Sequence, residues 1–194
     1  MRRPRLLAGL AAAAVGVALI VGLAQTGSGG TASRGGLPSA AAQASALAGA
    51  PAPLAALHAQ ASTLLDGGQR AFTGRLAALR GYPVVVYKWA SWCGPCRAES
   101  GLLARTALHE GRRVAFLGLD YDDPVSGARD FLAQYPQSYP SYVDGDGSIS
   151  QALLASYQPA TVFFDRSGRR VLTHQGPYAS EAELLADIAR YAQA

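Results

Sequence analysis

From the middle of the chain onward, short hydrophobic runs alternate with amphipathic stretches. Residues 83–87 are mostly β-branched and apolar, which is typical of a strand covered on both faces. A second apolar run at residues 113–119 predicts another strand. Residues 161–165 and 170–175 are separated by four residues that are polar apart from one glycine, so we expect a β-hairpin with a tight turn there.

Apolar residues at helical spacing fill the intervals between these strands. Asp123 and Pro124 supply an N-cap and a proline at the first helical position for one of the predicted helices. Ser180 and Glu183 form a capping box for the last helix. The predicted helices cover residues 54–65, 72–79, 93–109, 125–135, 149–156 and 181–191. Alternating strands and helices, then a hairpin and a closing helix, indicate an α/β fold around a mixed central sheet.

The N-terminal residues 1–24 are patterned for a membrane. Three arginines precede residues 6–24, which carry no charge, and a helix of that length rises about 28 Å, close to the hydrocarbon thickness of a bilayer. Cleavable signal peptides usually have a shorter apolar region of about 7–15 residues, so we favour an uncleaved, single-pass signal anchor over secretion after cleavage. Either alternative places the remaining chain on the extracytoplasmic side.

Residues 25–53 consist mainly of Gly, Ala, Ser and Pro and contain no aromatic residue. Such a composition buries too little apolar area to offset chain entropy, so this segment is predicted to be a flexible linker. One folded domain is then expected over residues 54–194.

The net charge of +4 comes from the N-terminal segment. Its first 50 residues hold four arginines and no acid, so the remaining chain carries 13 basic and 13 acidic residues. The predicted domain therefore has no net charge that would attract nucleic acid, and we expect no nucleic-acid partner.

The only two cysteines lie together, in the run Trp92-Cys93-Gly94-Pro95-Cys96, where a strand is expected to turn into a helix. Two thiols at this spacing can close and reopen a disulfide. A helix that begins at Cys93 places its sulfur near unpaired backbone amides, which stabilise a thiolate. We therefore expect Cys93 to be the nucleophile and Cys96, deeper on the same face, to be the resolving cysteine. Gly94 would let a substrate backbone approach, and Pro95 fixes φ in the first turn.

Other interpretations of the pair are less well supported. A structural disulfide that closes so short a loop restricts the unfolded chain little. A zinc site needs further ligands, and His58, His109 and His174 are scattered without ligand spacing, so we expect no metal. Attachment of haem requires a histidine where this chain has Arg97. An inert buried pair is disfavoured by the position at a helix start.

Residues 89–99, Trp-Ala-Ser-Trp-Cys-Gly-Pro-Cys-Arg-Ala-Glu, resemble the active-site segment of the thioredoxin superfamily. The resemblance is strongest to the membrane-anchored TlpA-like branch, which includes the thiol-disulfide oxidoreductases of cytochrome c maturation. It extends through residues 79–81, 139–144 and 158–168. It implies a thioredoxin-like three-layer fold with an extra helix and strand between residues 120 and 157.

The resemblance also implies roles for individual residues. Pro159 matches the cis-proline that faces the cysteine pair, and Gln158 before it would offer backbone hydrogen bonds to a bound peptide. Together with Trp92, Gly94 and Pro95, these two residues form the expected substrate-binding set. Glu99 matches a glutamate of the TlpA-like branch that can exchange a proton with the resolving thiol. A trans-proline and a solvated glutamate are the ordinary alternatives at these two positions.

Two residues depart from the family pattern. Tyr87 stands where thioredoxins carry a buried aspartate, and its reference pKa of about 10 makes it unsuited to relay protons near neutral pH. Lys88 replaces an aromatic residue, and we expect its ammonium to reach the surface.

These features predict a thiol-disulfide oxidoreductase whose only redox group is the Cys93–Cys96 pair, with no added cofactor. The Gly-Pro dipeptide between the cysteines is the one found in thioredoxin, whose potential is about −270 mV, so a reducing role is expected. The resemblance suggests a membrane thiol carrier as electron donor and protein disulfides, including those of apocytochrome c, as acceptors. The alternatives are a tethered, non-catalytic binding module, a general disulfide oxidant and a peroxide reductase.

Overall fold

The structure is a computed structural model that describes residues 39–192. The predicted anchor, residues 1–24, and the first part of the predicted linker lie outside the described residues. Within residues 39–192, none of the helices combines the length and the hydrophobicity that crossing a bilayer requires.

A six-stranded mixed sheet forms the centre of the fold, in the order β1-β4-β3-β2-β5-β6. The first four strands in this order run parallel to one another, and β5 and β6 add antiparallel pairs at the other side. The strands are β1 (Leu64–Leu65), β2 (Val84–Trp89), β3 (Ala115–Tyr121), β4 (Ser141–Asp144), β5 (Ala160–Phe164) and β6 (Arg170–Gln175). The fold is therefore the expected α/β class with a mixed central sheet.

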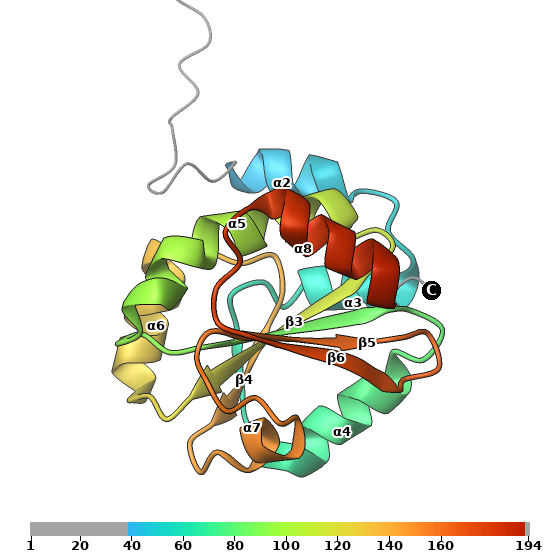
Figure 1. Ribbon diagram of the computed structural model, residues 1–194. Coiled ribbons are helices and arrows are strands. Elements are labelled where there is room, and N and C mark those ends of the chain that lie inside the picture. The colour runs from blue at the N-terminus through green and yellow to red at the C-terminus, as the bar shows by residue number, and fades with distance from the viewer. Residues whose placement is uncertain (1–38, 193–194) are drawn as a thin grey trace, which may run out of the picture. The chain divides into compact units, whose positions relative to one another are not determined.

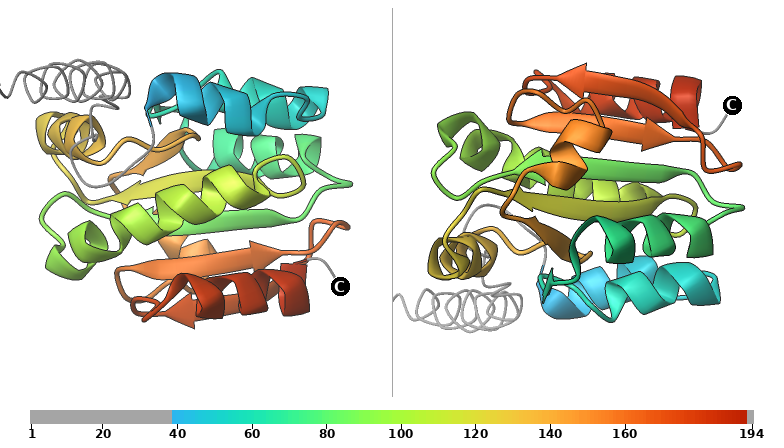
Figure 2. Two further views of the ribbon diagram at one scale, coloured as in Figure 1. Left: turned by 90° about the horizontal axis from the view of Figure 1, so that it is seen from above. Right: turned by 90° about the horizontal axis from the view of Figure 1, so that it is seen from below.

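Helices cover both faces of the sheet (Figures 1 and 2). One apolar cluster joins the sheet to α5, α6 and α8, and a second joins its opposite face to α3, α4 and α7. The helices are α2 (Ala40–Leu47), α3 (Ala52–His58), α4 (Gly68–Ala78), α5 (Gly94–Glu110), α6 (Val125–Gln134), α7 (Ser148–Ala152) and α8 (Glu181–Asp187), and the π-helical turn η1 (Ile188–Ala192) follows.

Strand β2 explains why the predicted apolar run is so uniformly hydrophobic. All six of its residues are buried, because neighbouring strands flank it and helices cover both faces. Val85 and Tyr87 face α5, whereas Val86 faces the opposite cluster, as the two-residue period of a strand requires. Tyr87 is thereby directed at the helix that carries the cysteines.

The surface position expected for Lys88 is wrong. Its side chain is only 2% exposed, because the strand period points it to the inner side of α7. Its Nζ donates to the Ala155 carbonyl at 2.9 Å and lies 3.7 Å from the centre of the Tyr121 ring. Burial lowers the pKa of Lys88, and the nearby Asp144 carboxylate opposes that shift.

The part of the predicted linker that the structure describes is helical, so the prediction of a flexible segment is wrong there. Residues Ala40–Leu47 form α2, with the Ser39 hydroxyl accepting from the Ala42 amide at 3.3 Å as an N-cap. Alanine-rich sequence has high helix propensity, and the buried Leu47 attaches the helix to the domain. The helix predicted over residues 54–65 ends instead at His58. Leu64 and Leu65, the last two residues of the predicted range, form the short edge strand β1.

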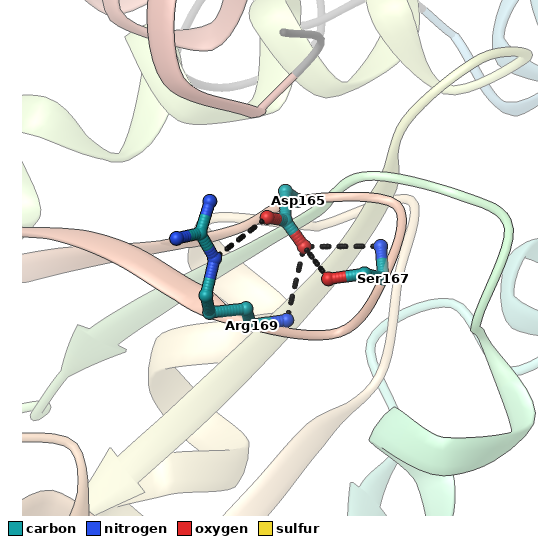
Figure 3. Close-up of polar contacts among 3 residues, drawn as sticks. All are labelled: Asp165, Ser167 and Arg169. Carbon is teal, nitrogen blue, oxygen red and sulfur yellow. Dashed lines mark hydrogen bonds and ion pairs between the residues drawn. The ribbon is translucent and has the colours of Figure 1, made fainter.

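The β5–β6 hairpin turns where the polar residues predicted it. The carboxylate of Asp165 accepts hydrogen bonds from the Ser167 amide and hydroxyl, at 3.0 and 2.6 Å, and from the Arg169 amide and Nε, at 3.0 and 3.1 Å (Figure 3). These donors, the Ser167 hydroxyl first, lower the pKa of Asp165 to about 2.

Replacing Asp165 by Asn should lower the melting temperature at pH 7, because the turn loses a charged acceptor. A depressed carboxylate pKa contributes stability that is present above about pH 4 and is lost as the pH falls through about 2. The difference in melting temperature between the two proteins should therefore narrow over that range. A difference that stays constant down to pH 2 would show that the charge of Asp165 is not responsible.

Candidate active site

The cysteine pair lies at the N-terminus of α5, directly after β2. Cys93 is the N-cap residue, and its Sγ accepts a hydrogen bond from the Cys96 amide at 3.2 Å. Pro95 lies in the first turn, where its missing N–H removes no helical hydrogen bond. The two sulfurs form a disulfide. The positive end of the helix dipole is therefore directed at the sulfur of Cys93.

The two cysteines differ in their surroundings. Both residues are buried, Cys93 being 4% exposed and Cys96 fully buried, but only Cys93 lines a groove. A side chain added at Gly94 would meet nothing within 4 Å, so the space beside Cys93 is open to a backbone. An incoming polypeptide can thus reach Cys93 first, and Cys96 only through Cys93.

A groove of about 440 Å³ runs past Cys93. One wall comes from the start of α5 and the two residues before it, and the other from the loop that leads into β5. Its lining residues are Trp92, Cys93, Gly94, Pro95, Ser156, Tyr157 and Gln158. Trp92 is 50% exposed and Tyr157 is 67% exposed, so two aromatic rings border the accessible sulfur. The groove brings together four of the five residues of the expected substrate-binding set.

Pro159, the fifth, is buried behind this groove, and the Gln158–Pro159 peptide bond is cis, as the resemblance implies. The preceding loop is held by Gln175 at the end of β6. The Gln175 side chain accepts from the Tyr157 amide at 3.1 Å and donates to the Leu154 carbonyl at 2.6 Å. Sequence reasoning missed Tyr157 and Gln175, because the two come together only through the β5–β6 pairing.

Glu99 lies one turn after Cys96, facing the interior. It is 4% exposed, and its Oε1 accepts from the Tyr178 amide at 2.7 Å. Burial raises the pKa of Glu99 to about 7, and hydrogen bonds from the Tyr178 amide and the Tyr87 side chain oppose the rise. Glu99 is therefore buried, and the alternative of a solvated carboxylate on the helix surface is wrong.

A second cavity, of about 670 Å³, is lined in part by Glu99. It is bordered by Arg97 and Arg105 of α5, by Tyr135, and by the segment that contains Tyr178. This cavity shares only Pro95 with the groove, so Glu99 and Cys93 line different cavities.

Polar groups also surround the buried cysteine backbone. The Tyr87 hydroxyl donates to the Cys96 carbonyl at 3.2 Å, and the Ser100 hydroxyl donates to the same oxygen at 2.6 Å. Burial first, and then the charge of Glu99, raises the pKa of Tyr87 well above its ordinary value, so the phenol stays protonated. Tyr87 therefore acts as a hydrogen-bond donor where the family pattern has an acid.

Metal ligation has no counterpart in the described part of the chain, where no three His, Cys, Asp or Glu side chains come together as ligands. His58 is used structurally, with its two ring nitrogens 3.1 and 2.9 Å from the Ser138 and Gly111 carbonyl oxygens.

Comparison with known proteins agrees with this geometry. The Redoxin family pattern matches residues 47–188. The thiol:disulfide interchange protein DsbE of Tatumella citrea is 33% identical over 138 residues, which are 71% of this chain and 70% of that protein. The soluble secreted antigen MPT53 of Mycobacterium tuberculosis is 30% identical over 58% of this chain and 65% of its own length. The chain spans only about half the length of several other DsbE proteins.

Solved structures show the same fold. A secreted Mycobacterium tuberculosis disulfide oxidoreductase, described as homologous to E. coli DsbE, superposes with a TM-score of 0.53 and 29% identity, over 59% of this chain and 85% of that one. The Mycobacterium tuberculosis DsbF structure gives a TM-score of 0.54 at 29% identity, over 58% and 83% of the two chains. The chain belongs to the Redoxin family and, within the thioredoxin superfamily, to the thiol-disulfide oxidoreductases of DsbE/TlpA type.

Proposed function

We propose that this protein reduces protein disulfides on the extracytoplasmic side of the membrane, with Cys93 attacking and Cys96 resolving. The observation that carries the proposal is the position of Cys93, which begins α5 and lines a groove, next to a second cysteine that is fully buried. Its role as a reductase is supported by the Gly-Pro dipeptide shared with thioredoxin.

The reaction moves one electron pair in two exchange steps. The Cys93 thiolate attacks one sulfur of the substrate disulfide, which forms a mixed disulfide and releases the other substrate sulfur as a thiolate. The Cys96 thiolate then attacks the Cys93 sulfur, which closes the Cys93–Cys96 disulfide and releases the second substrate thiolate. The substrate disulfide is reduced by two electrons, and the cysteine pair is oxidised by two.

Glu99 is proposed to take the proton of Cys96 in the second step. Its raised pKa, about 7, lets it accept and return a proton near neutral pH. Because Glu99 lines a cavity that shares only Pro95 with the groove, we propose that its proton can leave while a polypeptide covers Cys93.

The proposal also includes an electron donor and a cellular location. A reductase outside the cytoplasm needs an electron donor, for which a membrane thiol carrier is proposed, and apocytochrome c is the proposed acceptor. Two mycobacterial proteins that this chain resembles are described as secreted, which supports an extracytoplasmic location. The signal anchor at residues 1–24 is retained as a proposal about location.

The cysteine roles are tested by trapping. Replacing Cys96 by Ser should leave Cys93 able to attack but unable to be released, so mixed disulfides with partner proteins should accumulate in intact cells. Replacing Cys93 by Ser should abolish both exchange and trapping. Non-reducing gels and mass spectrometry would identify the partners. A Cys93→Ser, Cys96→Ser double variant that reduces disulfides as fast as the wild type would refute the proposal.

The buried glutamate is tested by the pH dependence of stability in the oxidised protein. A raised carboxyl pKa contributes stability that is present below about pH 4.5 and is lost as the pH rises through about 7. Relative to the Glu99→Gln variant, the wild type should therefore lose roughly 3 kcal/mol of unfolding free energy across that range. The exposed Asp66, changed to Asn, provides a control that should show no such trend. A difference between wild type and Glu99→Gln that does not vary with pH would mean that Glu99 titrates as a solvated acid.

A further inference from the structure

Asp123 does not do what its sequence position predicts. It was expected to cap the following helix, but Pro124 is the N-cap residue of α6 and no side chain caps that helix. The Asp123 carboxylate instead crosses to the turn before the cysteines. Its Oδ2 accepts from the Ser91 amide, and its Oδ1 accepts from the Ser91 hydroxyl at 2.7 Å. A charged acceptor thus serves a residue 32 positions away in the chain.

Neighbouring contacts reinforce this link. The Trp92 indole Nε1 donates to the Asp122 carbonyl at 3.0 Å, and Arg97 donates to the Ser91 carbonyl at 3.0 Å. A Cβ on Gly127 would lie 2.7 Å from the Ser91 hydroxyl and 3.0 Å from Asp123 Oδ1, so the first turn of α6 packs closely against the pair. The loop between β3 and α6 therefore forms hydrogen bonds with two consecutive residues of the active-site turn, Ser91 and Trp92.

The turn around Ser91 and Trp92 determines where the Cys93 sulfur lies. The Cys93 amide donates to the Ala90 carbonyl at 3.2 Å, which closes the turn around Ser91 and Trp92. That turn places Cys93 in the extended N-cap conformation in which its Sγ meets the Cys96 amide. If Ser91 shifts, both the sulfur and the Trp92 wall of the groove shift with it.

A second buried carboxyl group interacts with Asp123. Asp120, at the end of β3, is 1% exposed. Burial first, and then the carboxylates of Asp123 and Asp144, raises the pKa of Asp120 to about 8. Asp120 is therefore mostly protonated at pH 7 and adds little negative charge beside the Asp123 carboxyl group.

We propose that Asp123 is a positioning residue for disulfide exchange: by holding Ser91, it keeps the reduced Cys93 sulfur at the N-terminus of α5. The inference rests on the proposed function, because it assigns Asp123 an effect on the reactivity of Cys93. Asp123 would act through Ser91, because both of its hydrogen bonds described above are to that residue and neither is to a cysteine.

The test compares Asp123→Ala, Asp123→Asn and Ser91→Ala with the wild type. Asp130→Asn, at an exposed position of α6, serves as a control. For each reduced protein, the Cys93 thiol pKa is measured by thiolate absorbance. The redox potential is measured against glutathione, and the rate constant is measured for the reduction of a small disulfide at pH 7. Circular dichroism and the melting temperature establish that each variant is folded.

Asp123→Ala should raise the Cys93 thiol pKa by about one unit and make the redox potential more negative, since the thiolate loses stabilisation. For a wild-type thiol pKa of about 7, the thiolate fraction at pH 7 then falls about fivefold, but the more basic thiolate is about threefold more nucleophilic, so the rate constant should fall about twofold. Asp123→Asn should restore part of each change, because its amide oxygen still accepts from Ser91. Ser91→Ala should behave as Asp123→Asn does, and Asp130→Asn as the wild type.

A folded Asp123→Ala variant with the thiol pKa, potential and rate constant of the wild type would overturn the inference. If Asp123→Ala does not fold, Ser91→Ala decides, since it removes only the hydroxyl contact, and unchanged values for it would overturn the inference equally. The proposed function fails separately, if the wild type itself shows no exchange at Cys93. The shift in thiol pKa between variants would still report on the link between Asp123 and Cys93.

Discussion

The hydrogen bond from the Cys96 amide to the Cys93 sulfur is the contact on which the chemistry of this fold depends. It exists because a short turn after β2 leads into α5 at Cys93, so a free amide of the first helical turn, that of Cys96, points at the Cys93 sulfur. A negative charge at that atom is stabilised by that amide and by the helix dipole. The sheet, the two helical layers and the cis-proline loop keep this sulfur at the surface and its partner buried.

Two separate cavities lie beside the cysteine pair. The groove at Cys93 is bordered by two exposed aromatic side chains, Trp92 and Tyr157. The cavity at Glu99 shares only Pro95 with this groove among its lining residues. In the proposed function, the groove would receive the substrate disulfide and the cavity would let the proton of Glu99 leave.

Much of this arrangement could be predicted from local sequence. The β-branched run of β2, the polar hairpin turn at Asp165 and the helix start at the cysteines each have a signature within a few residues. The cis-proline came from a family resemblance and not from the residues alone. The thioredoxin-like architecture followed once these signals were combined.

What could not be predicted depends on partners far away in the chain. Lys88 is buried because Ala155, in the segment after α7, supplies a carbonyl and Tyr121 a ring, and neither partner can be predicted from the strand that contains Lys88. Asp123 has the sequence context of a helix cap, yet its donors come from Ser91. The two-residue strand β1 forms only because β4 lies beside it. In each case a tertiary contact overrides a sound local expectation.

The most direct measurement is the thiol pKa of Cys93 in the reduced wild-type protein, titrated by thiolate absorbance and by the rate of alkylation. The account predicts a value well below the ordinary cysteine pKa of about 8.5, together with alkylation of Cys93 in preference to Cys96. A pKa at or above that ordinary value, or a sulfur that resists alkylation in the folded protein, would contradict it.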